Sequence, residues 1–366
     1  MTAPSPSNSA LLHRETPIRV VVVEDSPTMR AILKTRLERD GDIVVVGAAA
    51  NASEGRTMIR ELDPDVITLD VEMPGMNGLD FLEKIMALRP TPVIVVSGST
   101  QRGTETTARA LALGAVNCYA KSERSGALPF DDSGLLAGLI REAAKVRFGE
   151  RVAAGSRPVS PGAGASNAGT EPRPGPAERP RVIAVGSSTG GVEALQILLS
   201  RFPENCPPTL IVQHIAPRFA PAVARTLDTH CAARIVLAEP DLPLREGHVY
   251  LAPGDDRHLT VAGSTALCCR LRQGERVSGH LPSVDVLFGS VARCVGARAV
   301  GILLTGMGCD GAQGLLAMAQ AGARTIAQDE ATCTVFGMPR AAIALGAAGL
   351  VAPIGQIARH AISQAA

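Results

Sequence analysis

A stretch with almost no large apolar side chains divides this chain of 366 residues in two. Residues 152–180, VAAGSRPVSPGAGASNAGTEPRPGPAERP, consist mostly of Gly, Pro, Ala and Ser. Such a segment cannot bury enough apolar surface to offset its ordering entropy, so it predicts a flexible linker. The length suits two α/β domains. We expect one domain at 17–145, a linker at 146–179 and a second domain at 180–366.

Composition narrows the classes of protein that fit. Hydrophobic residues make up 46% of the chain, enough for two cores, and 36 basic side chains face 35 acidic ones. This balance argues against nucleic-acid binding, which usually needs a basic surplus. No apolar run reaches the ~18–20 residues of a membrane span, and the first residues resemble a disordered leader, not a secretory signal. The eight cysteines form no Cys-x-x-Cys pair, which favours free thiols and a cytoplasmic location.

The first domain alternates short apolar runs with segments of helical periodicity. The amphipathic segments at 28–39 and 78–88 separate apolar runs and predict helices. Five strands connected by helices give a parallel sheet that is covered on both faces. The expected strands are 18–25, 42–48, 65–70, 92–98 and 115–121.

The second domain repeats this pattern and predicts a doubly wound α/β fold. A strand at 181–186 precedes a helix that begins near Gly190, and further strands are expected at 209–214, 299–306 and 324–328. Between them lie three short, turn-bounded segments, 247–254, 257–263 and 266–272. These predict an antiparallel ribbon inserted in the parallel sheet or attached to it.

Polar side chains follow the strands of the first domain. Glu24 and Asp25 come after its first strand, Asp70 ends the third, Ser97 the fourth and Lys121 the fifth. Chemistry gathers at the carboxyl ends of parallel strands, and carboxylates there suit a hard cation such as Mg²⁺. With a metal in place, Asp70 could accept a phosphoryl group as an acyl phosphate. Taken singly, each residue is better explained as a charged loop residue or a helix cap, as for Asp25 before Ser-Pro, and only the set of five together favours a site.

The segments VVVEDSPTMR (21–30), LDVEMPGMNGLDFL (69–82) and VSGS (96–99) resemble the flavodoxin-like receiver domains of two-component signalling. The resemblance covers the whole first domain. It implies that a histidine kinase phosphorylates Asp70 and that Ser97 and Lys121 sense the phosphoryl group. The implied Mg²⁺ ligands are the side chains of Glu24, Asp25 and Asp70 and the backbone carbonyl of Glu72.

Two positions depart from the receiver pattern. Ser122 follows Lys121 where receivers usually have proline, and Cys118 stands where an aromatic side chain often repacks on phosphorylation. Tyr119 is adjacent to that position. The pattern therefore predicts phosphorylation but leaves the aromatic part of the switch open.

A serine motif opens the second domain. Gly186-Ser187-Ser188-Thr189-Gly190 fits G-x-S-x-G with Ser188 at its centre, between a strand and a helix. Gly-rich turns of this kind also cradle phosphates, so this motif alone is ambiguous. His214 ends the next strand, and Asp310 follows the strand at 299–306 in a third Gly-rich turn. A nucleophile, a base and an acid at three strand ends predict a Ser-His-Asp triad.

The segments GSSTGG (186–191), QH (213–214), APGD (252–255), PSVDVLF (282–288), LTGMGCDG (304–311) and VFGMPR (335–340) closely resemble the chemotaxis protein-glutamate methylesterases, the CheB family. The resemblance implies hydrolysis of glutamate methyl esters on methyl-accepting chemotaxis receptors, and commonly also deamidation of receptor glutamines. It makes Ser188 the nucleophile, His214 the general base and acid, and Asp310 the orienting carboxylate. The backbone amides of Met307 and Thr189 are candidate oxyanion donors.

The resemblance also implies that the unphosphorylated receiver packs near the active site and inhibits it.

Two departures fall close to the motifs: Cys309 replaces an asparagine, and Leu281 replaces a basic residue after His280. A thiol nucleophile at Cys309 is an alternative, but no base is assigned to it. A second alternative is a nucleotide-binding enzyme in which GSSTGG cradles the phosphates. The segment lacks the G-x-G-x-x-G spacing that such a site needs. A non-catalytic scaffold or DNA-binding regulator is the third alternative.

Overall fold

The structure is a computed structural model, and it describes residues 16–73, 78–98, 100–121, 134–146, 181–264 and 266–362. The expected leader, Ser122 and all of the expected linker after residue 146 lie outside these ranges. Within them, no helix is both long and apolar enough to cross a membrane.

The first domain contains a five-stranded parallel sheet in the order β2-β1-β3-β4-β5, as expected. The parallel pairing follows from the helical crossovers, because two successive strands can run in the same direction only if the chain returns between them. Its strands are β1 (Ile18–Val23), β2 (Ile43–Ala49), β3 (Val66–Asp70), β4 (Val93–Ser97) and β5 (Asn117–Ala120). Its helices are α1 (Pro27–Leu37), η1 (Glu38–Asp40), α2 (Ala52–Leu62), α3 (Gly78–Leu88), α4 (Gln101–Ala112) and α5 (Leu135–Ala143).

Local sequence sets where these helices begin. Ser26 caps α1 by accepting a hydrogen bond from the Met29 amide, and Pro27 occupies the first turn, where a missing N–H costs nothing. The helix therefore starts after Asp25, which leaves the Asp25 side chain free for the strand-end cluster. Asn51 caps α2 in the same way and accepts from the Glu54 amide at 3.0 Å.

The second domain contains a seven-stranded sheet in the order β14-β13-β12-β6-β7-β9-β8, in which every recorded pairing is parallel. Its strands are β6 (Val182–Ser187), β7 (Thr209–Gln213), β8 (Arg234–Leu237), β9 (His248–Leu251), β12 (Ala299–Leu303), β13 (Arg324–Gln328) and β14 (Leu350–Ala352). Its helices are α6 (Gly191–Leu199), η2 (Pro217–Phe219), α7 (Ala220–Asp228), α8 (Val284–Cys294), η3 (Gly296–Arg298), α9 (Ala312–Gln320), α10 (Met338–Ala344) and α11 (Ile354–Ile362).

The expected antiparallel ribbon is present, but it has two strands and not three. β10 (Arg257–Ala262) and β11 (Cys268–Gln273) pair antiparallel and form a separate sheet. The expectation for 247–254 is wrong: β9 lies between β7 and β8 in the parallel sheet. Val249, Tyr250 and Leu251 are all buried, so β9 does not alternate between core and solvent. A four-residue strand is too short for periodicity to distinguish these two environments.

The strand order places a topological switch point in the middle of the second sheet. From β6 the chain first moves through β7 towards β8 and β9, and later returns to the other side through β12, β13 and β14. In open α/β sheets, ligands bind outside the carboxyl ends of the strands at such a point. We therefore expect the active or binding site at the turns that follow β6, β7 and β12.

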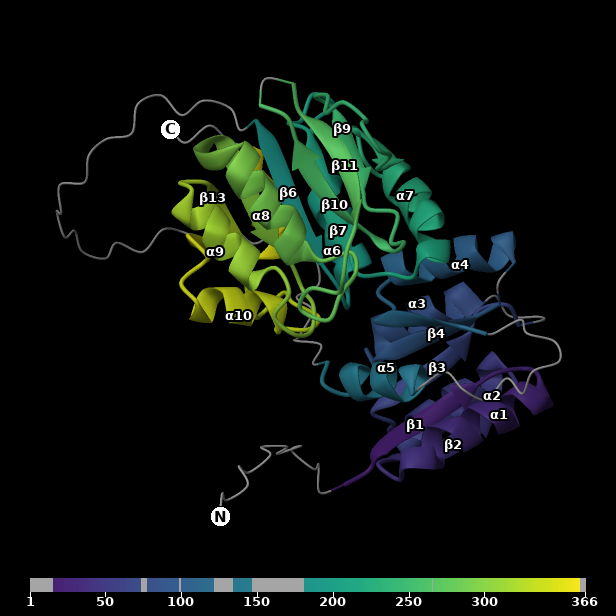
Figure 1. The fold of residues 1–366 in the computed structure, drawn as a ribbon. Helices are drawn as coiled ribbons and strands as arrows, with labels where there is room; N and C mark the ends of the chain where they lie inside the picture. The colour runs from purple at the N-terminus through teal and green to yellow at the C-terminus, as the bar shows by residue number, and fades with distance from the viewer. Residues whose placement is uncertain are drawn as a thin grey trace, which may run out of the picture.

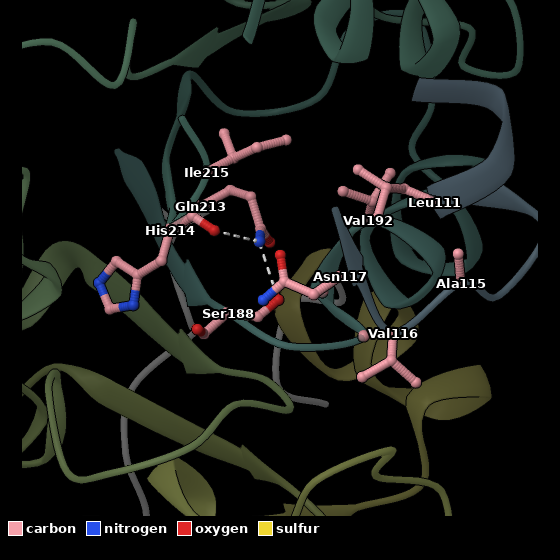
Figure 2. Close-up of a pocket in the computed structure, with 11 residues that line it drawn as sticks. Leu111, Ala115, Val116, Asn117, Ser188, Val192, Gln213, His214 and Ile215 are labelled. Carbon is pink, nitrogen blue, oxygen red and sulfur yellow. Dashed lines mark hydrogen bonds between the residues drawn. The ribbon is translucent and has the colours of Figure 1, made fainter. Parts of the chain in front are cut away.

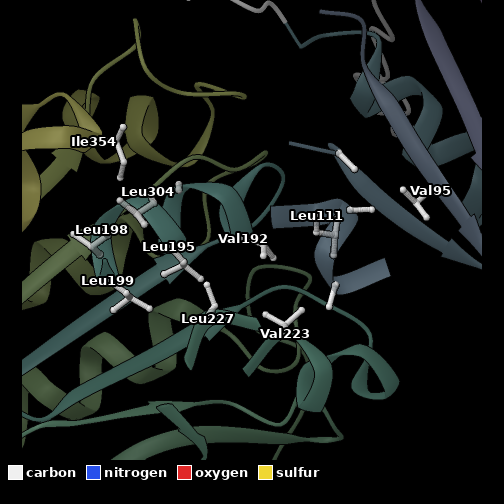
Figure 3. Close-up of a cluster of buried hydrophobic side chains, with 14 of the residues drawn as sticks. Val95, Leu111, Val192, Leu195, Leu198, Leu199, Val223, Leu227, Leu304 and Ile354 are labelled. Carbon is white, nitrogen blue, oxygen red and sulfur yellow. The ribbon is translucent and has the colours of Figure 1, made fainter. Parts of the chain in front are cut away.

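Each sheet has an apolar core on both of its faces. In the first sheet, α1 and α5 cover one face and α2, α3 and α4 the other; in the second, α8, α9, α10 and the ribbon cover one face and α6, α7 and α11 the other (Figure 1). The core on the α4 side of the first sheet continues into the core on the α6 and α7 side of the second. Figure 3 shows Leu111 of α4 near Val192 and Val223 of these helices. The two domains thus share buried apolar surface.

Candidate active site

Three turns converge at the carboxyl edge of the second sheet. Register pairs Leu303 of β12 with Gly186 of β6, and Ser187 of β6 with Gln213 of β7. Residues that follow these positions in the chain must therefore lie side by side, as the sequence predicted. The turn after β6 carries Ser188, the turn after β7 carries His214 and the turn after β12 carries Asp310.

His214 and Asp310 form a buried pair. Nε2 of His214 lies 2.9 Å from Oδ2 of Asp310, and their side chains are 9% and 0% exposed. Burial alone would raise the pKa of Asp310, but hydrogen bonds from His214, the Asp285 amide and Ser283 lower it below its usual value. An ionised carboxylate can only accept hydrogen bonds, so Nε2 of His214 carries the hydrogen. Nδ1 then holds the free lone pair and is the basic nitrogen.

The start of α8 holds the Asp310 carboxylate. Oδ1 accepts hydrogen bonds from the Ser283 hydroxyl at 2.7 Å and from the Asp285 amide at 3.0 Å, and Oδ2 accepts one from the Val284 amide at 2.8 Å. Free amides and positive potential at a helix N-terminus favour an anion there. The PSVD motif at 282–285 therefore orients the acid. The sequence identified this motif only by resemblance and assigned it no physical role.

Ser188 lies beside the ring of His214, and both line one small pocket. Figure 2 shows its hydroxyl directed towards the imidazole. Nδ1 of His214 is buried and has no hydrogen-bond partner within the described ranges. Among the described side chains, no hydrogen bond joins Ser188 to His214 in this state. His214 and Asp310 are thus bonded to each other, and Ser188 is adjacent to them but not bonded.

Glycines allow the turns around Ser188 to pack closely. A side chain at Gly306 would place a Cβ 2.7 Å from Cβ of Ser188, and Gly190 adopts a φ of +72° at the start of α6. The Ser188 amide donates to the Thr305 carbonyl at 3.0 Å, so it cannot serve as an oxyanion donor. Within the described part of the chain, the amides of Thr189 and Met307 donate no hydrogen bond. Both candidate donors are therefore available.

One side chain that the sequence reasoning missed joins the first two turns. The amide nitrogen of Gln213 donates to the carbonyls of Ser188 at 2.8 Å and His214 at 3.1 Å. Its amide oxygen accepts from the Ser187 hydroxyl at 2.6 Å. Gln213 is 3% exposed. A buried amide at a strand end, next to the predicted base, was the available sequence signal.

A second missed residue contacts the base directly. The ring of His280 is stacked on that of His214, with the ring centroids 3.7 Å apart and the planes within 5° of each other. Burial, together with the positive charge that His214 can carry, lowers the pKa of His280 to about 4. His280 is therefore neutral near pH 7. Its position two residues before Pro282 of the PSVD motif was a signal, but its partner was not predictable.

The structure also brings together three acidic residues and Lys121 at the strand ends of the first domain. Nζ of Lys121 lies 2.6 Å from Oδ2 of Asp70 and 2.8 Å from Oε2 of Glu24. Burial raises the pKa of Glu24 to about 7, the bond from Lys121 opposes this rise, and the charge of Asp70 adds to it. Carboxylate oxygens of Glu24, Asp25 and Asp70 lie within 4.8 Å of one another. This oxygen-rich set, which already attracts an ammonium group, fits a hard divalent cation.

The remaining predicted residues of this cluster lie at its rim. The Glu72 amide donates to Oδ1 of Asp70 at 2.8 Å, which places the Glu72 backbone beside the carboxylate. The Ser97 hydroxyl lies 3.1 Å from the carbonyl of Gly103 on α4 and makes no recorded contact with Asp70. The Tyr119 hydroxyl accepts a hydrogen bond of 2.5 Å from Nη1 of Arg36. Tyr119 is thus held by Arg36 in this state.

The first domain covers the serine turn of the second. The Gly190 amide donates to the carbonyl of Val116 at 3.2 Å. A small pocket lies between the domains, lined by Leu111, Val116 and Asn117 on one side and by Ser188 and His214 on the other (Figure 2). The amino end of α6 is thus occupied by the receiver backbone and by Thr334, which disfavours the phosphate-cradle alternative. Cys309 is exposed to solvent beside the buried Asp310.

Comparisons with known proteins agree with both halves of this description. The family model for CheB methylesterase matches residues 183–361, and that for the response regulator receiver domain matches residues 20–129. A protein-glutamate methylesterase/protein-glutamine glutaminase of Caulobacter vibrioides is 51% identical over 90% of this chain and 93% of its own length. One from Agrobacterium fabrum is 49% identical over 93% of this chain and 94% of its own. The crystal structure of the CheB methylesterase catalytic domain of Thermotoga maritima is 32% identical in sequence, and its TM-score is 0.49. The match covers 50% of this chain and 97% of that domain.

Proposed function

Because the chain belongs to the CheB methylesterase family and carries a receiver domain, we propose that it demethylates chemoreceptors in response to phosphorylation. The substrates are glutamate methyl esters on methyl-accepting receptors, and glutamine side chains are deamidated at the same site. The receiver occupies 17–145, a linker 146–179 and the catalytic domain 180–366. The protein acts in the cytoplasm, and a chemotaxis histidine kinase is the phosphodonor.

Hydrolysis follows from the two nitrogens of His214. Nδ1 takes the proton from the Ser188 hydroxyl as Oγ attacks the ester carbonyl, and the Asp310 carboxylate stabilises the imidazolium through Nε2. The amides of Thr189 and Met307 bind the oxyanion. Collapse of the tetrahedral intermediate transfers the proton to the departing methoxide, which leaves as methanol. Water, deprotonated by His214, then hydrolyses the acyl enzyme to release glutamate and the Ser188 hydroxyl. For a glutamine side chain, the leaving group is ammonia.

One observation carries this proposal above all others. Nε2 of His214 is bound to a buried, ionised carboxylate, while Nδ1 is buried without a partner among the described residues, on the side of Ser188. A buried ring nitrogen without a hydrogen-bond partner destabilises the folded state, so its presence calls for a functional explanation. Such a nitrogen supports a role in taking up the serine proton.

Phosphorylation is proposed at Asp70. Its carboxylate attacks the phosphoryl group of the kinase and forms an acyl phosphate, while Lys121 and Ser97 bind the phosphoryl oxygens. Glu24, Asp25, Asp70 and the Glu72 carbonyl would hold Mg²⁺, which neutralises charge on the phosphoryl oxygens when it is bound. In the state described here, Lys121 bridges Glu24 and Asp70 and the Ser97 hydroxyl is bonded to α4. Phosphorylation would therefore change contacts at the start of the helix that packs on the catalytic domain.

The test of the nucleophile uses the full chain with a small phosphodonor and Mg²⁺. Fluorophosphonate labelling and methanol release from methylated receptor membranes should both be lost in Ser188→Ala. Ser187→Ala is the matched control, because its hydroxyl bonds to Gln213 and not to the His214 side of the turn. It should still be labelled. Methanol release at the wild-type rate by Ser188→Ala would overturn the proposal.

A further inference from the structure

The base of the proposed triad is stacked against a second histidine that has no role in the mechanism above. His280 lies parallel to His214 at a centroid distance of 3.7 Å, so it covers one face of the catalytic ring. The His214 side chain is only 9% exposed. A ring bonded at Nε2 alone can still tilt or flip about its side-chain bonds unless its faces are also packed.

His280 is held in place by its own backbone. Ser278 and Gly279 have φ values of +52° and +83°, and the chain reverses direction between Val277 and His280. These two residues exchange amide–carbonyl hydrogen bonds of 3.0 and 2.9 Å. Positive φ at both central residues is typical of the tight turn that joins antiparallel strands. The Ser278 hydroxyl also donates to Oδ2 of Asp285 at 2.8 Å, which ties the turn to α8.

A buried histidine from the ribbon anchors both ends of this segment. Nε2 of His258 lies 2.9 Å from the Glu275 carbonyl, and Nδ1 accepts from the Ser283 amide at 3.1 Å. The side of the segment that continues into α8 is the one that binds Asp310. The 275–285 segment therefore contacts both residues of the acid–base pair. Its His280 stacks on His214, and its residues 283–285 bond to Asp310.

The charge state of His280 suits this position. Its pKa is lowered to about 4 by burial first and then by His214. Arg276 lowers it further and Asp310 raises it. Near pH 7 the ring is neutral, so it does not repel the imidazolium that His214 becomes during catalysis.

We propose that His280 is a positioning residue, whose flat neutral ring fixes the plane of His214 with Nε2 on Asp310 and Nδ1 towards Ser188. This inference rests on the proposed triad. It assigns His280 no proton transfer and no contact with the substrate. What the position requires is a planar, uncharged ring of similar size.

Three substitutions separate this role from the alternatives. His280→Phe keeps a planar neutral ring, His280→Leu keeps comparable volume without planarity, and His280→Ala removes the contact. In the phosphorylated full chain, we expect kcat for methanol release to fall about tenfold or more in the Ala and Leu variants, since small misplacements of catalytic groups carry costs of this order. The Phe variant should stay within about threefold of wild type, and KM should change little in all three.

The rate of fluorophosphonate labelling provides a readout without the natural substrate. It should fall in parallel with kcat in His280→Leu and be restored in His280→Phe. Equal activity of the Phe and Leu variants, or a change in KM alone, would overturn the positioning role. The latter would make His280 a substrate contact. Thermal unfolding checks that the Phe and Leu variants remain folded. Labelling that persists in Ser188→Ala would instead indicate failure of the proposed triad itself.

Discussion

The carboxamide of Gln213 shows how much a single side chain can organise in this site. It bonds to the carbonyls of Ser188 and His214 and to the hydroxyl of Ser187, so it sets the distance between the nucleophile turn and the base turn. The bond to Ser187 is buried and the other two are partly buried. A buried polar group left without a partner costs about 1–3 kcal/mol.

Replacement of Gln213 by leucine should therefore affect both stability and rate. We expect Gln213→Leu to lower the free energy of unfolding by about 2–4 kcal/mol, because Leu keeps the volume but leaves several buried groups unsatisfied. The kcat for methanol release should fall at least about tenfold. Gln196→Leu is the matched control, since Oε1 of Gln196 is buried without a partner among the described residues. A loss of stability in the control as large as in Gln213→Leu would contradict this interpretation.

The lowered pKa of His280 has a consequence for stability at mildly acid pH. In the unfolded chain a histidine titrates near 6.5, and in the folded chain His280 titrates at about 4. The folded state therefore resists protonation that the unfolded state accepts, so stability is complete above about pH 6.5 and declines as the pH falls towards 4. At pH 5 the loss is about 1 kcal/mol once solvent screening is allowed for.

Chemical denaturation of wild type and His280→Phe at pH 7.5 and pH 5 measures this loss. The wild-type chain should lose about 1 kcal/mol more than the variant between these two pH values, because phenylalanine does not titrate. Asp310 and Arg276 face His280 in both proteins, and their contributions should largely cancel. An equal loss in both proteins would show that His280 does not titrate in this range.

Helix α8 combines two tasks at its first turn. Ser283 caps the helix by accepting from the Val286 amide at 3.5 Å and donates the same hydroxyl to Oδ1 of Asp310 at 2.7 Å. The helix thus orients Asp310, the acid of the proposed triad, as part of its own capping. The cap of α2 has no such second task, because the Asn51 side chain bonds to Glu54 of its own helix and not to Asp310.

Comparison of these two caps separates stability from catalysis. Ser283→Ala and Asn51→Ala should each lower the free energy of unfolding by about 1 kcal/mol, the usual value of an N-cap. Only Ser283→Ala should lower kcat for methanol release, with little change in KM, because Asp310 loses one of its fixed donors. The same kcat in both variants would mean that Val284 and Asp285 suffice to hold the carboxylate.

The sequence predicts the strands of this fold better than the contacts between its turns. Long apolar runs such as 18–23 and 182–187 identify buried strands, and their ends place Ser188, His214 and Asp310 on one edge. β8 and β14, of four and three residues, were not predicted, because so short a run carries no period. The stack of His280 on His214 joins residues far apart in the sequence through a tight turn. No local pattern encodes such a contact.

The arrangement of the whole molecule places the receiver over the serine turn. Leu111 of α4 is 5% exposed and lies in the core shared with Val192 and Val223 of the catalytic domain (Figure 3). An ion pair of 3.3 Å between Arg225 and Glu105 lies at the rim of this interface, where both side chains are at least 50% exposed. Such a pair contributes little, so the apolar contact is the main source of docking energy.

A charge at the centre of this contact should therefore release the catalytic domain without phosphorylation. Leu111→Asp places a carboxylate in an apolar interface, and burying it unpaired costs more than a few kcal/mol. A substitution shifts the equilibrium between the docked and undocked states only if it changes the free energy of one state more than that of the other. The introduced carboxylate destabilises only the docked state, so it favours the undocked one. We expect methanol release by the unphosphorylated chain to rise several-fold, and the additional stimulation by a phosphodonor to shrink accordingly.

The control for this variant lies on the neighbouring helix of the same domain. Leu88 at the end of α3 is 75% exposed, so Leu88→Asp introduces the same charge without entering the interface and should leave both rates unchanged. Phosphorylation of Asp70 in Leu111→Asp, measured by Mg²⁺-dependent incorporation of phosphate, shows whether the receiver remains folded. If that variant is phosphorylated normally and its basal rate equals that of Leu88→Asp, apolar docking of α4 does not restrain the esterase. Restraint would then have to come from contacts outside this apolar patch, such as the backbone bond between Val116 and Gly190.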